Sequence, residues 1–487
     1  METLDKDLRS IQEVRNLIQK AKDAQEKLVT MSQQQIDAIV KAIADAGYKH
    51  RVQLAKMANE ETGFGRWEDK VIKNLFASKY VYEWIKDMKT VGIIGEDKVK
   101  KVIEVAVPVG VVAALIPSTN PTSTVIYKAM IALKAGNSVV FSPHPNALKC
   151  ILETTKVIYE AAKEAGCPEG AISCITVPSL QGTDQLMKHK DTSLILATGG
   201  TPMVKAAYSS GTPAIGVGPG NGPAFIEKSA DFRLAAKRII DSKTFDNGTI
   251  CASEQSVVVE KCSKDAVITE FKKQGAYFLS NEEADKLAKF IMRPNGSMNP
   301  QIVGKSVEHI AKLANLTIPA GTRVLIANET RVGHNIPYSR EKLGPILAFY
   351  VEEDWKAASE RCIEILHGEG AGHTMMIHSE NDEIIRYFGL KMPVSRLLVN
   401  TPGTLGGIGA STGIAPALTL GCGAVGGGST SDNVSPLNLM NIRRVAFGIR
   451  ELEDLVEEPP ASSAQAMSSQ DKEQLINAIV KRILEKI

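Results

Sequence analysis

The chain has 487 residues, a formal net charge of +2, 44% hydrophobic residues and 23% charged residues. A single hydrophobic core stops growing near ~250 to 300 residues, so this length supplies material for two or three cores. The near-neutral charge gives no electrostatic reason to expect nucleic acid or a membrane surface as a partner. A multidomain globular enzyme is the default prediction.

The amino-terminal residues contain no apolar secretory core, and no run of about 18 apolar residues occurs anywhere. The cysteines include no Cys-x-x-Cys pair, which argues against a disulfide scaffold and a zinc ribbon. We therefore expect a cytoplasmic protein without a membrane segment, in which free thiols persist. The seven cysteines are Cys150, Cys167, Cys174, Cys251, Cys262, Cys362 and Cys422.

Apolar residues at helical spacing between residues 6 and 46 predict that the chain opens with amphipathic helices. Short β-branched runs then alternate with helical stretches, and this pattern predicts a doubly wound parallel sheet. A second alternating set follows residue 251. The expected strands are 109–116, 138–141, 171–177, 193–197, 255–260, 323–327 and 346–351, and the expected helices are 127–134, 147–165, 282–292 and one from residue 265.

The carboxy-terminal region differs in composition from the rest. A stretch rich in Pro, Ser and Ala at 457–469 is typical of a linker, and residues 470–487 place apolar side chains on one face of a short helix. An isolated helix of this length is marginal in water, so we expect it to dock, either on its own enzyme or on a partner. Its apolar residues are Leu475, Ile476, Ile479, Val480, Ile483, Leu484 and Ile487.

The most informative segment is 245–256, Phe-Asp-Asn-Gly-Thr-Ile-Cys-Ala-Ser-Glu-Gln-Ser, which carries Cys251 among small neighbours. A thiolate attacks a carbonyl carbon well, and small neighbours leave room for a substrate. The segment alone also fits a buried structural cysteine, since free cysteine is among the most buried residue types. The rest of the chain favours the catalytic interpretation.

Eight segments along the chain carry a recognisable pattern. They are 68–74 (EDKVIKN), 117–123 (PSTNPTS), 141–145 (FSPHP), 216–221 (GVGPGN), 245–256, 341–345 (EKLGP), 370–374 (GAGHT) and 431–436 (SDNVSP). In this order they resemble the CoA-acylating aldehyde dehydrogenases, in particular those of bacterial microcompartments and the aldehyde half of bifunctional aldehyde/alcohol dehydrogenases.

The resemblance implies an α/β aldehyde dehydrogenase fold with a Rossmann-like cofactor domain, an α/β catalytic domain and an oligomerisation segment, in a homodimer or homotetramer. We predict amino-terminal helices and a dinucleotide-binding domain at 1–240, and the catalytic domain at 241–415. A return to the cofactor domain with an oligomerisation strand follows at 416–456, then the linker at 457–469. The helix at 470–487 resembles encapsulation peptides that bind microcompartment shell proteins, which would place the enzyme in the compartment lumen.

In the implied reaction, Cys251 adds to a small aldehyde, hydride passes to NAD, and an acyl thioester remains on Cys251. The oxyanion donors are the Cys251 amide and the Thr119–Asn120 pair, with the choice between the two side chains left open. Hydrolytic relatives carry a water-activating glutamate in a segment matching 217–223, which reads Val-Gly-Pro-Gly-Asn-Gly-Pro here. CoA, whose thiol needs less activation than water, is therefore the expected acyl acceptor. For Glu254 we favour a structural role over that of a substitute base.

No Gly-x-Gly-x-x-Gly fingerprint opens a βα unit. The resemblance places the cofactor at a variant site instead, with Glu341 on the nicotinamide ribose and Ser142 where many hydrolytic relatives have a lysine. This last departure leaves NAD versus NADP open. The expected cofactor-binding residues are Ser142, Pro143, His144, Thr198, Gly199, Gly200, Thr201, Gly218 and Glu341.

Two further patterns resemble sites of other kinds, namely a metal site and a phosphate-binding loop. His373 has His367, Glu369 and His378 nearby, yet the spacing matches no zinc motif, so we predict no metal. The glycines at 421–428 lack the Gly-Lys-Ser/Thr ending of a phosphate loop. The prediction is an enzyme that converts a short aldehyde, acetaldehyde or propionaldehyde with sulfoacetaldehyde left open, reversibly to acyl-CoA. The alternatives are a hydrolytic aldehyde dehydrogenase and a non-catalytic shell partner.

Overall fold

The computed structural model describes residues 5–455 and 468–485. Contacts within the chain divide it into two units, of which the first comprises 1–94 and 105–443 and the second 95–104 and 444–487. Within the described residues, none of the helices combines the length and the apolar character of a membrane span.

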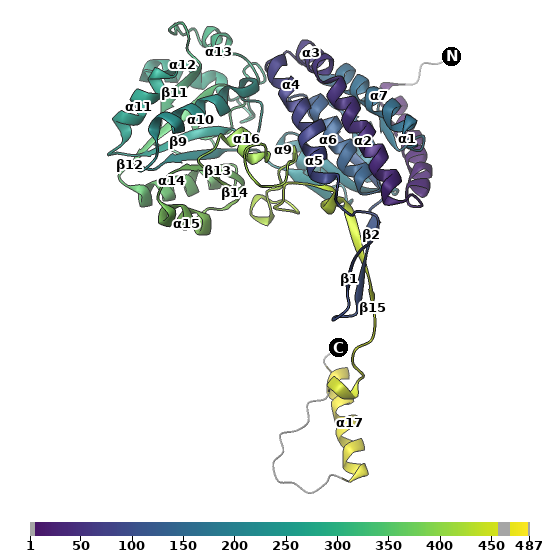
Figure 1. Ribbon diagram of the computed structural model, residues 1–487. Coiled ribbons are helices and arrows are strands. Elements are labelled where there is room, and N and C mark those ends of the chain that lie inside the picture. Colours follow the sequence, from purple (N-terminus) through teal and green to yellow (C-terminus); the bar gives the residue numbers. More distant parts are fainter. Residues whose placement is uncertain (1–4, 456–467, 486–487) are drawn as a thin grey trace. The chain divides into compact units, whose positions relative to one another are not determined.

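A five-stranded parallel sheet in the order β5-β4-β3-β6-β7 forms one half of the first unit. The purple and blue helices of this half lie together in Figure 1. Every residue of β3 and β4 is buried, as expected for parallel strands covered on both faces. The strands are β3 (Val111–Ile116), β4 (Ser138–Pro143), β5 (Ile172–Cys174), β6 (Thr192–Thr198) and β7 (Ala214–Val217).

Alternate residues of β3 divide between two cores, because successive side chains of a strand point to opposite faces. Val111, Ala113 and Leu115 pack with α1 and α8, whereas the intervening residues pack with α2, α6 and α7. These two sets of helices therefore cover opposite faces of the sheet. The helices of this half are α1 (Lys6–Leu28), α2 (Gln33–Lys49), α3 (Arg51–Thr62), α4 (Trp67–Leu75), α5 (Val81–Ile85), α6 (Pro121–Lys134), α7 (Leu148–Glu164), α8 (Leu180–Lys188) and α9 (Thr201–Tyr208).

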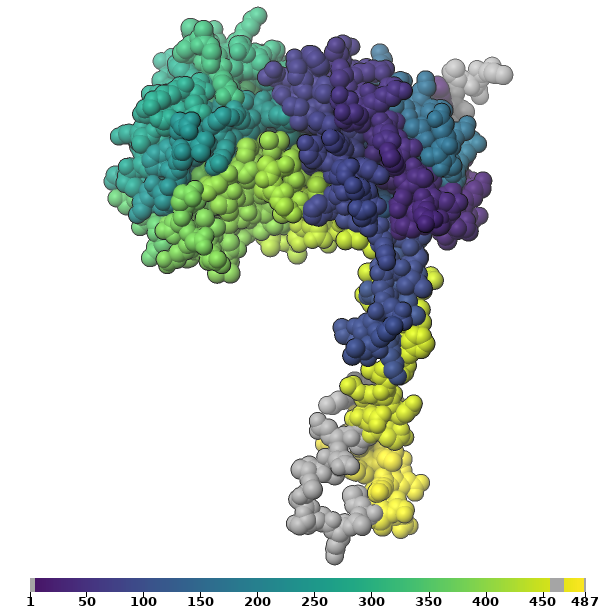
Figure 2. All heavy atoms as spheres, viewed as in Figure 1, coloured from purple at the N-terminus to yellow at the C-terminus, as the bar shows by residue number. Residues whose placement is uncertain are grey.

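A seven-stranded parallel sheet in the order β10-β11-β12-β9-β8-β13-β14 forms the other half. Its residues, teal to green in Figure 2, gather beside the purple and blue amino-terminal residues. The strands are β8 (Gly222–Ile226), β9 (Glu254–Glu260), β10 (Ala276–Phe278), β11 (Val324–Asn328), β12 (Ile346–Glu352), β13 (Gly372–His378) and β14 (Val394–Val399). The helices are α10 (Phe232–Thr244), α11 (Lys264–Lys273), α12 (Asn281–Ile291), α13 (Val307–Leu313), α14 (Trp355–Gly368), α15 (Asp382–Lys391) and α16 (Gly403–Gly407).

The predicted α/β class with parallel sheets is confirmed. The domain boundaries stay predictions, and one observation bears on them. Strand β8 lies before the predicted boundary at residue 240, yet it pairs with β9 and β13 of the seven-stranded sheet.

A third sheet joins β1 (Gly92–Asp97), β2 (Val102–Pro108) and β15 (Met440–Ala446) in that order. The last element, α17 (Ser469–Leu484), begins at a capping box in which the Ser468 side chain accepts from the Asp471 amide. Every described residue of α17 is exposed, including Leu475, Ile479 and Ile483. The predicted linker at 457–469 lies outside the described residues apart from Ser468 and Ser469.

Candidate active site

A cavity of about 980 Å³ lies in the first unit, at the carboxyl ends of β3, β4 and β6 and directly before β9. In open parallel sheets, ligands bind at the carboxyl ends of strands where the strand order reverses, as it does around β3. The structure brings all the site residues expected from the sequence to the wall of this cavity. They are Thr119, Asn120, Ser142, Pro143, His144, Thr198, Gly199, Gly200, Thr201, Gly218, Cys251 and Glu341.

Cys251 follows a tight turn whose backbone is unusual. Asp246, Asn247 and Gly248 all have left-handed φ values, of 49°, 52° and 77°. Such a conformation costs of order 1 to 3 kcal/mol for each non-glycine residue, so surrounding contacts must hold it. The Asp246 amide donates to Asp69 Oδ2 at 2.9 Å, and Asn247 Nδ2 donates to the Gly304 carbonyl at 3.0 Å. The turn that presents the cysteine is thus fastened on both sides.

The Cys251 side chain is a free thiol, partly exposed to the cavity. Gly220 lies against its backbone, because a Cβ at position 220 would stand 1.7 Å from the Cys251 carbonyl oxygen. Burial, followed by the nearby Glu341 carboxylate, raises the pKa of the thiol to about 12. The thiol is therefore protonated at neutral pH, and any reaction in which it acts as a nucleophile requires loss of this proton first.

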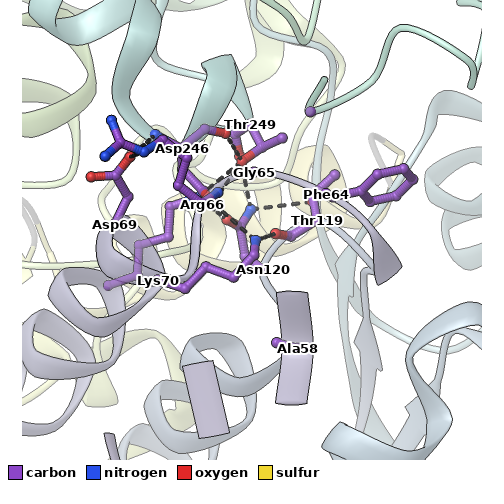
Figure 3. A network of polar contacts seen from close by, with 12 residues as sticks. Ala58, Phe64, Gly65, Arg66, Asp69, Lys70, Thr119, Asn120, Asp246 and Thr249 are labelled. Atoms are coloured by element: carbon purple, nitrogen blue, oxygen red, sulfur yellow. Dashed lines mark hydrogen bonds and ion pairs between the residues drawn. The ribbon is translucent and has the colours of Figure 1, made fainter. Parts of the chain in front are cut away.

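A buried ion cluster supports the turn from below (Figure 3). Asp246 Oδ2 accepts from the ammonium groups of Lys70, at 3.0 Å, and Lys73, while its Oδ1 accepts from the Arg66 amide at 2.7 Å. The three side chains are at most 3% exposed. Burial opposes ionisation of Asp246, yet Lys73 and Lys70 hold its pKa below the ordinary value. Burial also lowers the pKa of Lys73 to about 8, against the opposing attraction of Asp246.

Thr119 and Asn120 join this cluster to the cavity wall. Both residues lie in the loop between β3 and α6. The Lys73 ammonium donates to Asn120 Oδ1 at 2.5 Å, and the Lys70 ammonium donates to the Thr119 carbonyl at 3.0 Å. The loop is therefore tied to the same carboxylate that holds the cysteine turn.

The expected cofactor residues leave space for a dinucleotide. A Cβ on Gly218 would have no atom within 4 Å, so the glycine keeps part of the cavity open. The buried Thr198 hydroxyl has no hydrogen-bond partner among the described residues, whereas the Ser142 and Thr183 hydroxyls pair at 2.8 Å. His144 Nδ1 accepts from the Asn146 amide at 3.1 Å, which starts the turn before α7. An open wall with an unsatisfied hydroxyl fits a polar ligand such as a nucleotide.

Two carboxylates line the cavity within the described part of the chain, and both are engaged. Glu341 Oε1 accepts from the Gly220 amide at 2.9 Å, and burial together with Glu369 raises its pKa to about 8. Glu369 pairs with Arg340 at 2.8 Å and accepts from the Glu341 amide. Gly218 and Pro219 line the cavity without adding a carboxylate.

Glu254 is fully buried and does not line the cavity. Its Oε1 accepts from the Gly403 amide at 2.8 Å, and burial raises its pKa to about 7. His373 lies inside strand β13, fully buried, with Nδ1 in contact with Thr374 Oγ1 at 2.9 Å. Across the described ranges, no group of three or more His, Cys, Asp or Glu side chains is placed to hold a metal ion.

Sequence reasoning gave no role to Lys73 and Asp246, although both lie in segments that carry the resemblance. The signal available was indirect: an Asp-Asn-Gly triplet favours left-handed backbone, and two lysines three residues apart share one face of a helix. The partnership itself joins residues 173 positions apart, which one sequence does not reveal.

Comparison with known proteins agrees with this architecture. The model of the aldehyde dehydrogenase family matches residues 7–363. The chain is 44% identical over 442 residues to the bifunctional aldehyde-alcohol dehydrogenase of Escherichia coli K12, covering 90% of this chain and 50% of that protein. It thus spans about half the length of such curated relatives. It is 41% identical to the acetylating succinate-semialdehyde dehydrogenase of Clostridium kluyveri, covering 90% of this chain and 96% of that one.

Solved structures are similar over most of the chain. A probable aldehyde dehydrogenase from Listeria monocytogenes has a TM-score of 0.92 at 74% identity, covering 93% of this chain and 100% of that one. An acetylating aldehyde dehydrogenase from Geobacillus thermoglucosidasius has a TM-score of 0.91 at 54% identity, covering 92% and 99%. A propionaldehyde dehydrogenase from a Clostridium phytofermentans fucose utilisation bacterial microcompartment has a TM-score of 0.81 at 29% identity, covering 89% and 97%. The chain therefore belongs to the aldehyde dehydrogenase family.

Proposed function

We propose that the protein is a CoA-acylating aldehyde dehydrogenase, which converts a short aldehyde, NAD and CoA to acyl-CoA, NADH and a proton. The observation that carries the proposal is a cavity that holds the Cys251 thiol without a carboxylate in the 217–223 segment. Relatives named as acetylating enzymes support the same reaction class.

Cys251 is the nucleophile in this proposal, and its own amide together with the Thr119–Asn120 loop stabilises the oxyanion. The proposed cofactor-binding residues are Thr198 to Thr201, Gly218, residues 142–144 and Glu341, all of which line the cavity. In the proposal, residues 142–144 bind the adenosine side and Glu341 binds the nicotinamide ribose. NAD supplies the hydride acceptor when bound, and NADP is the alternative cofactor.

The acyl acceptor is inferred from the absence of a carboxylate in residues 217–223. Water needs a general base to attack a thioester, and residues 217–223, which match the segment that carries the water-activating glutamate of hydrolytic relatives, contain no carboxylate. A thiol is partly ionised near neutral pH and needs less help. Exchange of one thioester for another changes the free energy little, so the reaction runs in both directions.

The cavity favours an uncharged aldehyde over an anionic one. The cations that line it within the described residues are Lys73 and Arg340. Lys73 already donates to Asn120, Asp246 and Thr249, and Arg340 pairs with Glu369. Within the described residues, both cations that line the cavity therefore already have partners, which disfavours a substrate with a sulfonate or a second carboxylate. The proposed substrates are acetaldehyde and propionaldehyde, which the apolar wall accommodates through Ile250, Ile408, Leu418 and Leu420.

The carboxy-terminal helix has a separate role in the proposal, as an encapsulation peptide. Its apolar residues from Leu475 to Leu484 are exposed, and one structural neighbour comes from a bacterial microcompartment. We accordingly place the enzyme in the cytoplasm, in the lumen of such a compartment, with 470–487 contacting shell proteins. The exposed apolar residues Ile442, Val445, Phe447 and Ile449 are the proposed contact of a homodimer or homotetramer.

The test of the proposed activity is NADH formation from propionaldehyde and NAD with and without CoA, with the product identified by mass. Propionyl-CoA, formed only when CoA is present, is the expected result. Steady NADH formation with free propionate in the absence of CoA would show a hydrolytic enzyme instead.

A further inference from the structure

The loop between β3 and α6 offers two side chains to the oxyanion, Thr119 and Asn120, and both line the cavity with Cys251. A donor to the oxyanion needs an N–H or O–H that no other acceptor occupies. The hydrogen bonds of the two side chains differ in this respect.

Lys73 fixes the orientation of the Asn120 amide. An ammonium group can only donate, so the atom 2.5 Å from Lys73 Nζ must be the carboxamide oxygen. The remaining hydrogens of the ammonium go to Asp246 Oδ2 and, at 3.1 Å, to Thr249 Oγ1. Because all three hydrogens have acceptors inside the protein, Lys73 holds Asn120 in one position.

The Asn120 amide group then has no hydrogen left for a substrate. Its Nδ2 donates to the Thr249 carbonyl at 3.1 Å and to Thr119 Oγ1 at 3.2 Å. These two bonds use both hydrogens of the NH₂ group. The first also ties the loop to the residue two positions before Cys251.

Thr119 is left with a free donor. Its hydroxyl oxygen accepts from Asn120, which leaves the hydroxyl hydrogen without an acceptor among the described residues and able to point into the cavity. Its carbonyl is held by the Lys70 ammonium, so the residue is fixed at both ends. The loop leads directly into α6, whose amino-terminal end favours negative charge.

We propose that the Thr119 hydroxyl, and not the Asn120 amide, is the side-chain donor to the oxyanion, and that Asn120 and Lys73 are positioning residues that act through it. The inference rests on the proposed function. After the Cys251 thiol has lost its proton to solvent, the Sγ–C bond forms and the carbonyl π electrons move to oxygen. The Thr119 O–H and the Cys251 N–H stabilise that oxygen. Collapse of the oxyanion then restores the C=O bond and releases hydride, for which a bound nicotinamide would be the acceptor.

The test measures the first hydride transfer alone, as a single turnover of NADH with propionaldehyde and NAD in the absence of CoA. Thr119→Val keeps the shape of the side chain and removes the donor, whereas Thr119→Ser keeps the donor. Loss of one oxyanion donor costs about 10² to 10³-fold in rate. We expect a loss in this range for T119V and a rate within about fivefold of wild type for T119S. The rate of Cys251 alkylation by iodoacetamide, which forms no oxyanion, stays unchanged in both.

A double-mutant cycle separates a donor from a positioning residue. If Asn120 acts through Thr119, Asn120→Ala slows the wild type but adds less than threefold to the loss already present in T119V. A T119V loss below thirtyfold, or losses that multiply in the double variant, would overturn the inference. Failure of the proposed function is a different result, because the wild type itself would then form no NADH, or would form NADH continuously with free propionate in the absence of CoA.

Discussion

Asp246→Asn is the substitution that tests the buried cluster most sharply. Asparagine adopts left-handed backbone readily, so the change leaves the φ of 49° unstrained and removes only the charge. It leaves Lys70 and Lys73, both at most 3% exposed, without a counter-ion. Removing one partner of a buried ion pair costs about 3 to 5 kcal/mol. We expect a loss of this size at pH 6 in urea unfolding followed by tryptophan fluorescence.

The pH dependence of that loss has a definite sign. Burial lowers the pKa of Lys73 to about 8 from an ordinary value of 10.5, so between these values the unfolded chain binds more protons and stability rises with pH. The variant lacks the Asp246 charge, which raises the pKa of Lys73 in the wild type. The rise of its stability with pH therefore begins below pH 8. The difference in the free energy of unfolding between Asp246→Asn and the wild type should therefore become smaller from pH 6 to pH 8.

The matched control is Asp69→Asn. Asp69 Oδ2 accepts from the Asp246 amide and lies 3.9 Å from Arg66 Nε. Among the described residues, Asp69 makes no hydrogen bond or ion pair with either lysine. Asparagine can still accept that bond, so we expect a loss of about 1 kcal/mol or less. An Asp246→Asn variant within 1 kcal/mol of wild type, or no more affected than the control, would show that the lysines do not depend on this carboxylate.

Three other predictions concern the nucleophile and the last helix. Cys251→Ala should abolish turnover without a change in circular dichroism or melting temperature, and residual turnover above one per cent would exclude Cys251 as the nucleophile. Glu341→Gln removes a negative charge that raises the pKa of the Cys251 thiol, so alkylation by iodoacetamide at pH 9, above the Glu341 pKa of about 8, should accelerate up to about tenfold; an unchanged or slower rate would contradict the coupling. Deletion of 468–487 should leave turnover unchanged and abolish co-purification with microcompartment shells, and retained association would refute the targeting role.

The strands could be predicted where they are continuous apolar runs. Strands β3, β4, β6, β9 and β12 all lie within one or two residues of the predicted ranges, because buried parallel strands read as uninterrupted β-branched stretches. Helix α6 was expected from residue 127 and begins at Pro121. Its first turn contains Thr122, Ser123 and Thr124, which are poor helix formers in isolation, while proline at the first position is favourable there.

Shorter or glycine-containing strands escaped prediction. Strands β7 and β8 have four and five residues with glycine in each, which leaves little periodicity to recognise. The segment around His373 is not among the predicted strands, whereas residues 372–378 form the buried strand β13. Two histidines in a fully buried strand contradict the usual composition of such strands, so only the tertiary structure reveals it.

The motifs that form the candidate site could be predicted from the sequence, whereas the hydrogen bonds that connect them could not. Local motifs indicated the site residues from Thr119 to Glu341 that were expected to line the cavity, since turns, small residues and the cysteine segment are local features, but they did not indicate Lys73. The bonds from Lys73 to Asn120 and Thr249 join residues far apart in the chain. The sequence alone does not show which donors pair with which acceptors, because these residues meet only when the two halves of the first unit are folded.

The central claim is that an acyl thioester on Cys251 is shielded from activated water and released by a thiol. Intact-protein mass spectrometry of the enzyme mixed with propionaldehyde and NAD, followed over minutes without CoA and then after its addition, tests this most directly. We predict a stable mass increase of one propionyl group, absent from Cys251→Ala, that disappears on addition of CoA as propionyl-CoA forms. Loss of the acyl group to free propionate within seconds, before any CoA is added, would contradict the account.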